Sequence, residues 1–574
     1  MHQAKGNLSL LVLVDTSKEV DYAFVEEEMF AAFRHLGMPC EVLDLSRGMF
    51  SEEDLMGHAA VVIAQEGLGS GLSEGSVRAL LGAVEAGVGL VNFDGLLARY
   101  LGLADALGIS LSSVRSAPLV TGLVASDGAH YITSSQDRDA PKQLCKPVEM
   151  GGIAEGSDPS ETILRTQDGH PAALVSRYGR GKVVQYLISP KIWLNEVFGH
   201  GRGLDDVFWK SIVWAARKPF AMLAMPPFVT ARVDDGVGSH SDFGYVGVYN
   251  LHGYLPSIGL FLDEMDDRKG EIVRQYAELG TAEFAAHAFR YEDLILFDYH
   301  RGPYSAEQLE ENLARVDERF QRWGVQPARI INAHYGEWSE RSVEMLQSRG
   351  HDFVMCWRLP DELALGLHRD WRPAPYGNYG FLFDQLPGHP GMYALFCAPD
   401  RPDSKVYLPD KEHFVLTRGM YKDDVDYLWR HTSFREESPV NDIEGAAQAA
   451  SRSIRLGLDS LFFGSFTTHE QRITALSLEE LDAILSRVDE LTSGYEKIYK
   501  GHDAIAQYMK NRRQAWIVCA CAAPGSGKVT VDLAGETEVP LQVYLFSDEG
   551  EEIRYELREI SAFSGSTSVP LEMG

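Results

Sequence analysis

Cysteine is scarce in this chain of 574 residues, which has six, and no two of them form a CxxC pair. The missing pairs exclude a zinc ribbon, and the scattered positions argue against a disulfide framework. Reduced, mostly buried thiols are typical of a cytoplasmic protein. We therefore expect a cytoplasmic location, although a secreted protein trimmed of its signal peptide would look the same.

Positive charge is also scarce, because 53 Lys and Arg residues stand against 83 Asp and Glu residues, a net charge of −30. No dense run of Lys or Arg interrupts the sequence. A surface this negative repels phosphate backbones and anionic lipids. We expect neither a nucleic acid nor a membrane as a partner.

Long apolar runs are missing as well. The run at 8–15 holds about eight residues and ends in Asp15, which predicts a strand and neither a signal peptide nor a membrane span. With 45% hydrophobic and 24% charged residues, the composition is that of a globular protein, which excludes disordered and low-complexity classes. The length predicts about three to five domains.

The first 220 residues alternate between strand-like and helix-like segments. Four apolar segments predict strands, at 8–15, 40–45, 58–65 and 89–93. Two amphipathic segments predict helices, at 26–37 and 73–87. Because strands that alternate with single helices pair in parallel, we expect residues 1–220 to form an α/β sandwich around a parallel sheet.

This order of segments resembles class I glutamine amidotransferase-like domains, and the resemblance continues through 170–187 and 211–219. Working members of that class carry a nucleophilic Cys at a strand-to-helix elbow. The corresponding segment VVIAQEGLG, which starts at Val61, has no Cys. The resemblance therefore implies a domain without catalytic activity, which extends a binding surface or mediates formation of a homo-oligomer.

The rest of the chain changes character twice. From 228 to 500, apolar segments alternate with long amphipathic helices such as 305–324. About 270 residues of this alternation predict a complete or distorted (β/α) barrel, whose strands carry function at their carboxyl ends. Short strands with Gly-rich turns then predict a small β-sandwich at 510–574. The predicted fold class is thus a multidomain α/β protein.

Two adjacent carboxylates, Asp234 and Asp235, follow an apolar strand and precede a glycine that lets the chain turn. Both can face one cleft only where the strand ends. Four of the 18 histidines lie at or just beyond apolar segments of the same block: His287, His300, His334 and His469. Their shared location favours a metal site over separate structural roles.

The order of these residues resembles the polysaccharide deacetylase superfamily, whose domain is a distorted βα barrel. Its members carry Asp-Asp-Gly after the first strand, then a His-x-x-x-His motif and an Arg-Pro-Pro-Tyr-Gly loop. A late His follows the last strand. The resemblance covers 228–495, roughly half of the chain, and its motifs are short.

Carried over by position, the resemblance implies that Asp234 is the general base and that Asp235 and His287 bind the metal. The second His of the family motif falls at 291, where this chain has Tyr291. His300 is the nearest substitute and is taken as the third ligand, with His334 as its rival.

The family's Arg-Pro-Pro-Tyr-Gly loop corresponds to the segment 332–336, which reads Asn-Ala-His-Tyr-Gly. The Tyr and the Gly are kept, so the resemblance gives the backbone N–H of Tyr335 a place in the oxyanion hole. The Arg is lost, and with it the usual partner of the base Asp234.

The remaining roles follow from the same resemblance. His469 matches the late His that protonates the leaving group, and its neighbour Glu470 is expected to orient the imidazole. We expect Asn332, His334 and Trp338 to line the substrate cleft, where an aromatic face can stack on a sugar ring.

The resemblance implies a hydrolase that removes an acetyl group from an N- or O-acetylated saccharide. One divalent ion, held by one carboxylate and two imidazoles, activates water and polarises the carbonyl in such sites. Zinc is the default ion for this donor set, and nickel, cobalt or manganese would fit comparably.

Two other classes of function stay open. A metal-free glycoside hydrolase would use two carboxylates, for example Asp234 and Glu337, and would not need the histidines. A non-catalytic carbohydrate-binding or scaffold protein would explain why Tyr291 and Asn332 stand where the family has other residues. Absence of metal from the native protein would favour these two.

Overall fold

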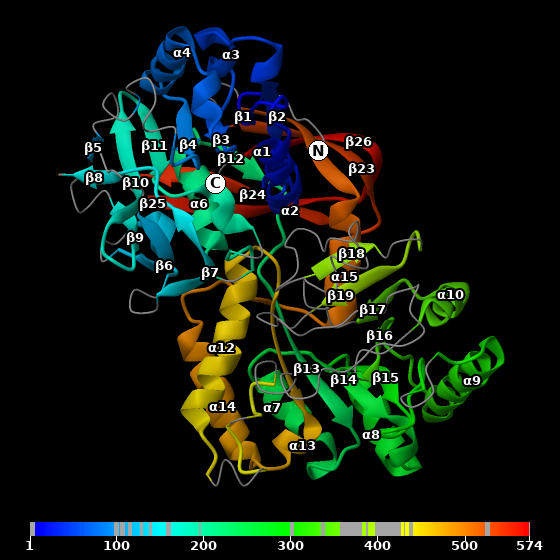
Figure 1. Cartoon of the computed structure of the whole chain (residues 1–574). Coiled ribbons are helices and arrows are strands. Elements are labelled where there is room, and N and C mark those ends of the chain that lie inside the picture. Colours follow the sequence, from blue (N-terminus) through cyan, green and yellow to red (C-terminus); the bar gives the residue numbers. More distant parts are fainter. Residues whose placement is uncertain are drawn as a thin grey trace. The chain divides into compact units, whose positions relative to one another are not determined.

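The chain folds as two compact units, one made of Met1–Met225 with Asn511–Gly574 and the other of Pro226–Lys510. Figure 1 shows the computed structural model coloured along the sequence. The structure describes the following residues: 6–96, 103, 109–112, 118–126, 130–136, 141–155, 162–194, 197–201, 203–298, 303–334, 339–355, 382–385, 389–396, 426–429, 431–434, 440–522, 528–550 and 552–572.

The first unit is built on a nine-stranded sheet in the order β2-β1-β3-β4-β11-β10-β9-β6-β7. Its strands are β1 (Leu10–Val14), β2 (Cys40–Asp44), β3 (Ala60–Ile63), β4 (Gly89–Asn92), β6 (Leu119–Ala125), β7 (Lys142–Glu149), β9 (Thr162–Thr166), β10 (Pro171–Tyr178) and β11 (Gly181–Tyr186). The four strands predicted here are confirmed. A separate pair is formed by β5 (Ser110–Ser112) and β8 (Ile153–Glu155).

The expected parallel sheet is parallel over only half of its width, from β2 to β11. From β11 to β7 neighbouring strands run antiparallel. The physical reason is visible between β10 and β11, which are joined by Gly179 and Arg180 alone. A connection of two residues can join only antiparallel strands. The sheet is therefore mixed.

Helices of the first unit are α1 (Glu19–Phe24), α2 (Phe30–Leu36), α3 (Glu52–Met56), α4 (Glu74–Glu85) and α6 (Asp205–Ala215). The two predicted helices are present as α2 and α4. Helix α4 begins after Ser73, whose hydroxyl accepts a hydrogen bond from the backbone N–H of Ser76, and this satisfies one of the free donors of the first turn.

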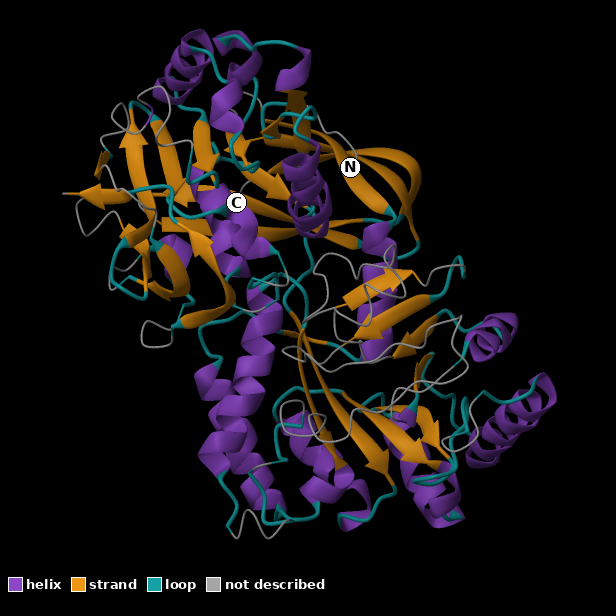
Figure 2. Ribbon diagram, viewed as in Figure 1, coloured by secondary structure: helices purple, strands orange, loops and turns teal. Residues whose placement is uncertain are grey.

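The C-terminal strands complete the first unit (Figure 2). One antiparallel sheet contains β22 (Ala515–Ala522), β23 (Lys528–Thr537) and β26 (Phe563–Glu572). The other contains β24 (Leu541–Glu549), β25 (Glu552–Ile560) and β12 (Phe220–Met222), which comes from the N-terminal part of the chain. The pairing of β12 with β24 ties these C-terminal strands, which lie in the segment 510–574 predicted as a β-sandwich, to the N-terminal segment.

The second unit holds a parallel sheet in the order β15-β14-β13-β20, with β21 pairing to β13. Its strands are β13 (Phe228–Gly236), β14 (Pro256–Phe261), β15 (Glu283–Ala288), β20 (Gly464–His469) and β21 (Ile498–Tyr499). A second sheet contains β16 (Ile330–Asn332), β17 (Phe353–Met355), β18 (Leu382–Gln385) and β19 (Tyr393–Phe396). The multidomain α/β class is confirmed, while closure of these sheets into a barrel stays a prediction.

Helices of the second unit are α7 (Tyr245–Leu251), α8 (Asp267–Glu278), α9 (Ala306–Trp323), α10 (Glu340–Ser348), α12 (Ile443–Asp459), α13 (Glu470–Ile473) and α14 (Leu478–Leu491). Helix α15 (His502–Arg513) begins in this unit, and its last three residues are counted with the first. The helix predicted at 305–324 is confirmed as α9, which ends at Gly324 with a φ of 68°. In the part of the chain that the structure describes, no helix combines the length and hydropathy of a membrane-crossing segment.

The two faces of the parallel sheet differ in chemistry, and this difference positions the site. Val229, Ala231 and Val233 of β13 belong to the apolar core that includes residues of α7, α8, α9, α12 and α14. Successive side chains of a strand point to opposite faces. Thr230, Arg232 and Asp234 therefore share the other face, and the polar residues gather there.

Candidate metal centre

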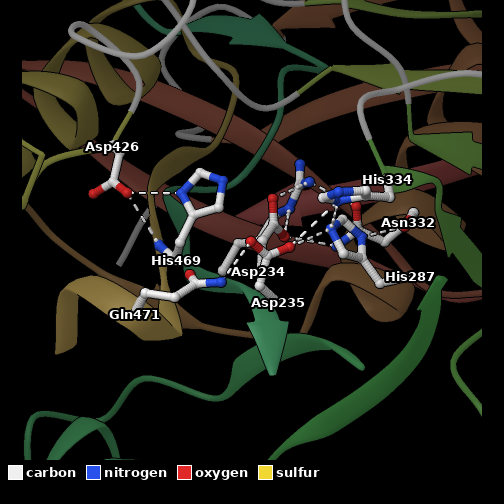
Figure 3. Close-up of polar contacts among 9 residues, drawn as sticks. Asp234, Asp235, His287, Asn332, His334, Asp426, His469 and Gln471 are labelled. Carbon is white, nitrogen blue, oxygen red and sulfur yellow. Dashed lines mark hydrogen bonds and ion pairs between the residues drawn. The ribbon is translucent and has the colours of Figure 1, made fainter. Parts of the chain in front are cut away.

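The end of β13 brings two adjacent carboxylates into one site. Asp235 has a φ of 56°, in the left-handed region that Asp tolerates better than most residues. The pairing with β14 shifts register between Val233 and Gly236. This local turn breaks the alternation of side chains, so that Asp234 and Asp235 lie together at the carboxyl end of the strand (Figure 3).

Asp235 forms a group of three possible metal ligands with His287 of β15 and His334, which lies just beyond β16. His287 Nε2 lies 3.1 Å from Asp235 Oδ1 and 2.8 Å from His334 Nδ1. His334 Nδ1 lies 3.3 Å from the same carboxylate oxygen. All three side chains are buried, with at most 5% of each residue exposed.

This donor set fits a divalent transition-metal ion. Ligand atoms held about 2.0–2.2 Å from zinc stand roughly 3–3.5 Å apart, close to the three separations found here. Asp235 Oδ1 is buried and takes part in no hydrogen bond of acceptable geometry among the described residues. A buried carboxylate oxygen that faces two ring nitrogens at these distances has the chemistry of a metal ligand.

The surroundings of the two imidazoles suit the same role. His287 Nδ1 donates a hydrogen bond to the carbonyl of Asn332 at 2.6 Å, which leaves Nε2 with its lone pair. Burial lowers the pKa of His334 to about 4, although the neighbouring Asp235 carboxylate opposes this, so its ring is neutral at pH 7. Burial alone would raise the pKa of Asp235, but both imidazoles hold it well below the ordinary value.

Gln471 fixes the other oxygen of the first ligand. Its Nε2 donates a hydrogen bond of 2.9 Å to Asp235 Oδ2 (Figure 3). Asp235 Oδ2 is thereby occupied, and Oδ1 remains to face His287 and His334. Such outer hydrogen bonds orient metal ligands and raise the affinity of a site.

Asp234 is held by an arginine from its own strand. Arg232 Nε donates to Asp234 Oδ1 at 2.7 Å and Arg232 Nη2 donates to Oδ2 at 2.6 Å. Asn332 Nδ2 donates to Asp234 Oδ1 at 2.8 Å, and Asn332 Oδ1 accepts from Arg232 Nη2 at 2.6 Å. Burial would raise the pKa of Asp234, but the charges of Arg232 and His469 lower it to about 2.

His469 ends β20 beside Asp234, its Cα partner across the sheet. His469 Nδ1 lies 2.7 Å from Asp426 Oδ2, and Trp429 lies edge-on to its ring at 6.4 Å. Burial would lower the pKa of His469, but Asp426, Asp235 and Asp234 raise it to about 9. The imidazole is therefore protonated at neutral pH and has a proton to give.

Glu470 is predicted from the sequence to orient the imidazole of His469, but its carboxylate forms hydrogen bonds elsewhere. Its buried carboxylate accepts hydrogen bonds from the backbone N–H groups of Val237, Gly238 and Ser239, at 3.0, 3.1 and 2.5 Å. It therefore holds the turn that follows Asp235, while the partner of the imidazole is Asp426. Adjacent side chains of a chain that leaves a strand point apart, which explains the difference.

The remaining residues that the sequence predicts for the site divide into three groups. Asn332 is 1% exposed and connects Arg232, Asp234 and His287, so it supports the site from within. His334 joins the metal ligands. His300, Tyr335 and Trp338, with Glu337 of the glycosidase alternative, lie outside the described residues.

Three side chains of the site were not found from the sequence, namely Arg232, Asp426 and Gln471. The place of Arg232 could have been predicted, because it precedes Asp234 by two residues and must share its face of the strand. Gln471 carried no such signal, because it lies beyond the end of β20, in helix α13, where the alternation of a strand no longer holds. Asp426 carried none, since no strand or helix pattern surrounds it.

No family model matches the sequence, and no curated protein matches it. Solved structures match weakly. A protein from Mycobacterium smegmatis, provisionally described as a polysaccharide deacetylase, has 12% identity and a TM-score of 0.31, covering 50% of this chain and 91% of its own. Puue allantoinase has 12% identity and a TM-score of 0.29, with 49% and 88% covered.

A third match is a protein from Thermoplasma acidophilum that is provisionally described as one component of a GMP synthase. It has 11% identity and a TM-score of 0.25, covering 36% of this chain and 94% of its own. Likenesses this weak carry no argument about function.

Proposed function

We propose that the protein is a metal-dependent hydrolase, and that it removes an acyl group, acetyl in the first instance, from a carbohydrate. The observation that supports this best is one arrangement of charges. An ionised Asp234 and a protonated His469 end neighbouring strands, next to the three donors Asp235, His287 and His334.

Asp235, His287 and His334 would hold the ion, with zinc as the first choice for one carboxylate and two imidazoles. When bound, a divalent ion supplies Lewis acidity to the acyl carbonyl and lowers the pKa of a water molecule. Gln471 and the carbonyl of Asn332 orient two of the three ligands.

Asp234 is the group that accepts the proton of the attacking water. Its low pKa keeps it ionised at working pH, and Arg232 with Asn332 fixes the direction of its oxygens. A carboxylate of such low pKa does not retain the proton. The proton passes to the neighbouring His469 once that imidazole has protonated the leaving group, so both groups regain their starting state.

His469 is the group that gives a proton to the departing amine or alcohol. Asp426 holds its Nδ1, which leaves Nε2 to act on the leaving group. The backbone N–H of Tyr335 would donate to the oxyanion, a contribution of about 3–4 kcal/mol in comparable sites.

The carbohydrate part of the proposal has separate support. The order of motifs resembles deacetylases of saccharides, and Tyr291 has 47% of its surface exposed beside His334, at 5.5 Å between ring centres. An exposed aromatic face next to a metal ligand offers a platform for a sugar ring of the substrate.

The test is metal content together with acetate release. Protein purified without chelator or a metal-affinity column should contain about one equivalent of transition metal, and should release acetate from acetylated saccharides. Asp235→Ala and His287→Ala should lose both the metal and the activity. His351→Ala, at a half-buried histidine of the same unit that is not among the three donors, serves as the matched control and should keep both.

Each result decides between the classes of function. Absence of metal from the wild type, even after zinc is offered, would contradict the proposal and favour the binding or glycosidase alternatives. Metal without acetate release would retain the hydrolase site and remove the acetylated saccharide as substrate.

A further inference from the structure

The face of the parallel sheet that carries Asp234 stays polar toward the amino ends of its strands, away from the candidate metal centre. Thr230 and Arg232 of β13 are Cα partners of Ser465 and Thr467 of β20. Since partners in a parallel pair project to the same face, these four side chains line one surface beneath Asp234 and His469. Barrels and sheets of this kind are usually filled there with large branched apolar residues.

Several polar atoms on this surface have no hydrogen-bond partner in the part of the chain that the structure describes. Thr230 Oγ1, Ser465 Oγ and Thr467 Oγ1 form no hydrogen bond to any described residue. The same holds for both ring nitrogens of His502, at the start of α15. All four residues are at most 2% exposed.

His502 belongs to the same buried region. Its ring lies edge-on to Phe463, with ring centres 6.1 Å apart, and Phe463 precedes Ser465 by two residues on the chain. Burial, with the nearby charge of Arg232, lowers the pKa of His502 to about 3. A neutral imidazole has one donor and one acceptor, and neither has a partner among the described residues.

Leaving five polar atoms of one region unpaired would cost considerable stability, and native proteins avoid this by binding internal water. The unpaired groups are three hydroxyls and a neutral imidazole, without a carboxylate among them. They suit a small neutral ligand that can both donate and accept, and they do not suit an ion.

We infer that a cluster of ordered water molecules is bound on this surface and links the hydroxyls of Thr230, Ser465 and Thr467 to His502. The cluster lies beneath the Arg232–Asp234 ion pair, on the side away from the metal ligands. The water molecules supply further hydrogen bonds to this ion pair. A buried ion pair needs such hydrogen bonds if its burial is not to destabilise the protein. The inference does not depend on the proposed activity.

The test compares two substitutions at one position. Thr230→Val keeps the shape of the side chain and removes its hydroxyl, whereas Thr230→Ser keeps the hydroxyl. Long-lived internal waters are counted by magnetic relaxation dispersion of water oxygen-17 for the wild type and both variants. Thr230→Val should lose at least one water and melt at a lower temperature, while Thr230→Ser should keep the full count.

An unchanged water count in Thr230→Val would overturn the inference. In a dry interior, removing an unpaired hydroxyl should instead raise the melting temperature. Ser465→Ala gives the same comparison if Thr230→Val does not fold. A crystal structure of the wild type provides a direct check, with ordered water expected within hydrogen-bond distance of His502.

Discussion

His469 Nδ1 lies 2.7 Å from Asp426 Oδ2, although 43 residues separate the two along the chain. Asp426 is itself fixed, because it accepts hydrogen bonds from the hydroxyl of Thr468 at 2.6 Å and from the backbone N–H of Leu428 at 2.9 Å. The proton on the imidazole therefore depends on a carboxylate that is rigidly held.

Asp426→Asn should lower the pKa of His469, because the substitution removes the negative charge that favours the protonated ring. The wild type keeps that proton until the pH rises through about 9, so its activity should fall there. In the variant this fall should begin at lower pH, as measured by kcat/KM across pH. A lost general acid typically costs about 10²–10⁴-fold in rate, which is the loss expected for His469→Ala.

A matched control exists in the same unit, where His431 Nδ1 lies 3.1 Å from Asp442 Oδ2 and neither residue belongs to the site. Asp442→Asn should leave the pH profile unchanged. Identical profiles for Asp426→Asn and the wild type would remove His469 from proton transfer.

Arg232→Met should raise the pKa of Asp234, because burial then acts on the carboxylate without the charge that opposes it. The acid limb of the pH profile should move to higher pH, since the base is ionised only above its pKa. Removing one partner of a buried ion pair also destabilises a protein by about 3–5 kcal/mol, which urea unfolding would measure. Arg274→Met, at an exposed pair with Glu271, should change neither quantity.

Gln471→Leu should weaken metal binding by about 10–100-fold, because Asp235 Oδ2 loses the donor that orients the carboxylate. Isothermal titration with zinc measures the change directly. Gln448→Leu, which removes a similar amide from an exposed pair with Glu444, should bind zinc as the wild type does. Equal affinity in all three proteins would show that the amide has no influence on the ligand.

Gly259→Ala should disturb the site, because a Cβ there would lie 2.7 Å from Asn332 Nδ2 and 3.0 Å from His287 Cγ. Overpacking of this kind costs about 1–3 kcal/mol, and zinc affinity should fall with it. Gly247→Ala on α7 meets no atom within 4 Å. It should stabilise the helix by roughly 0.5–1 kcal/mol, since Ala favours the helix over Gly. Thermal unfolding with and without zinc distinguishes the two.

The strand ends of the second unit could be predicted because apolar segments there are short and regularly interrupted. That pattern placed Asp234, Asp235, His287 and His469 at one edge, and the structure brings them together. The pattern gives no distances between strands, so it left His300 and His334 as rivals for the third ligand. The structure places His334 within reach of Asp235, and His300 lies outside the described residues.

Periodic patterns along the sequence cannot predict which residues meet when they lie far apart in the chain. Asp426 meets His469 only because the chain returns to the end of β20, and no local periodicity encodes that return. The mixed sheet of the first unit had a local signal in the tight turn at Gly179 and Arg180, where a glycine in the left-handed region permits the reversal. The prediction for this unit rests on the alternation of its first strands with helices, and that alternation indicates parallel pairing only.

The three possible ligands come from places far apart in the chain, and the two imidazoles alone are 47 positions apart. No short stretch of the unfolded polypeptide can bring them to one point, so an ion would bind the native second unit far better than the denatured chain. Binding of that kind shifts the unfolding equilibrium, by about 2.7 kcal/mol at a hundredfold excess over Kd. The midpoint of thermal unfolding would then rank candidate ions by affinity, without any assay of the reaction.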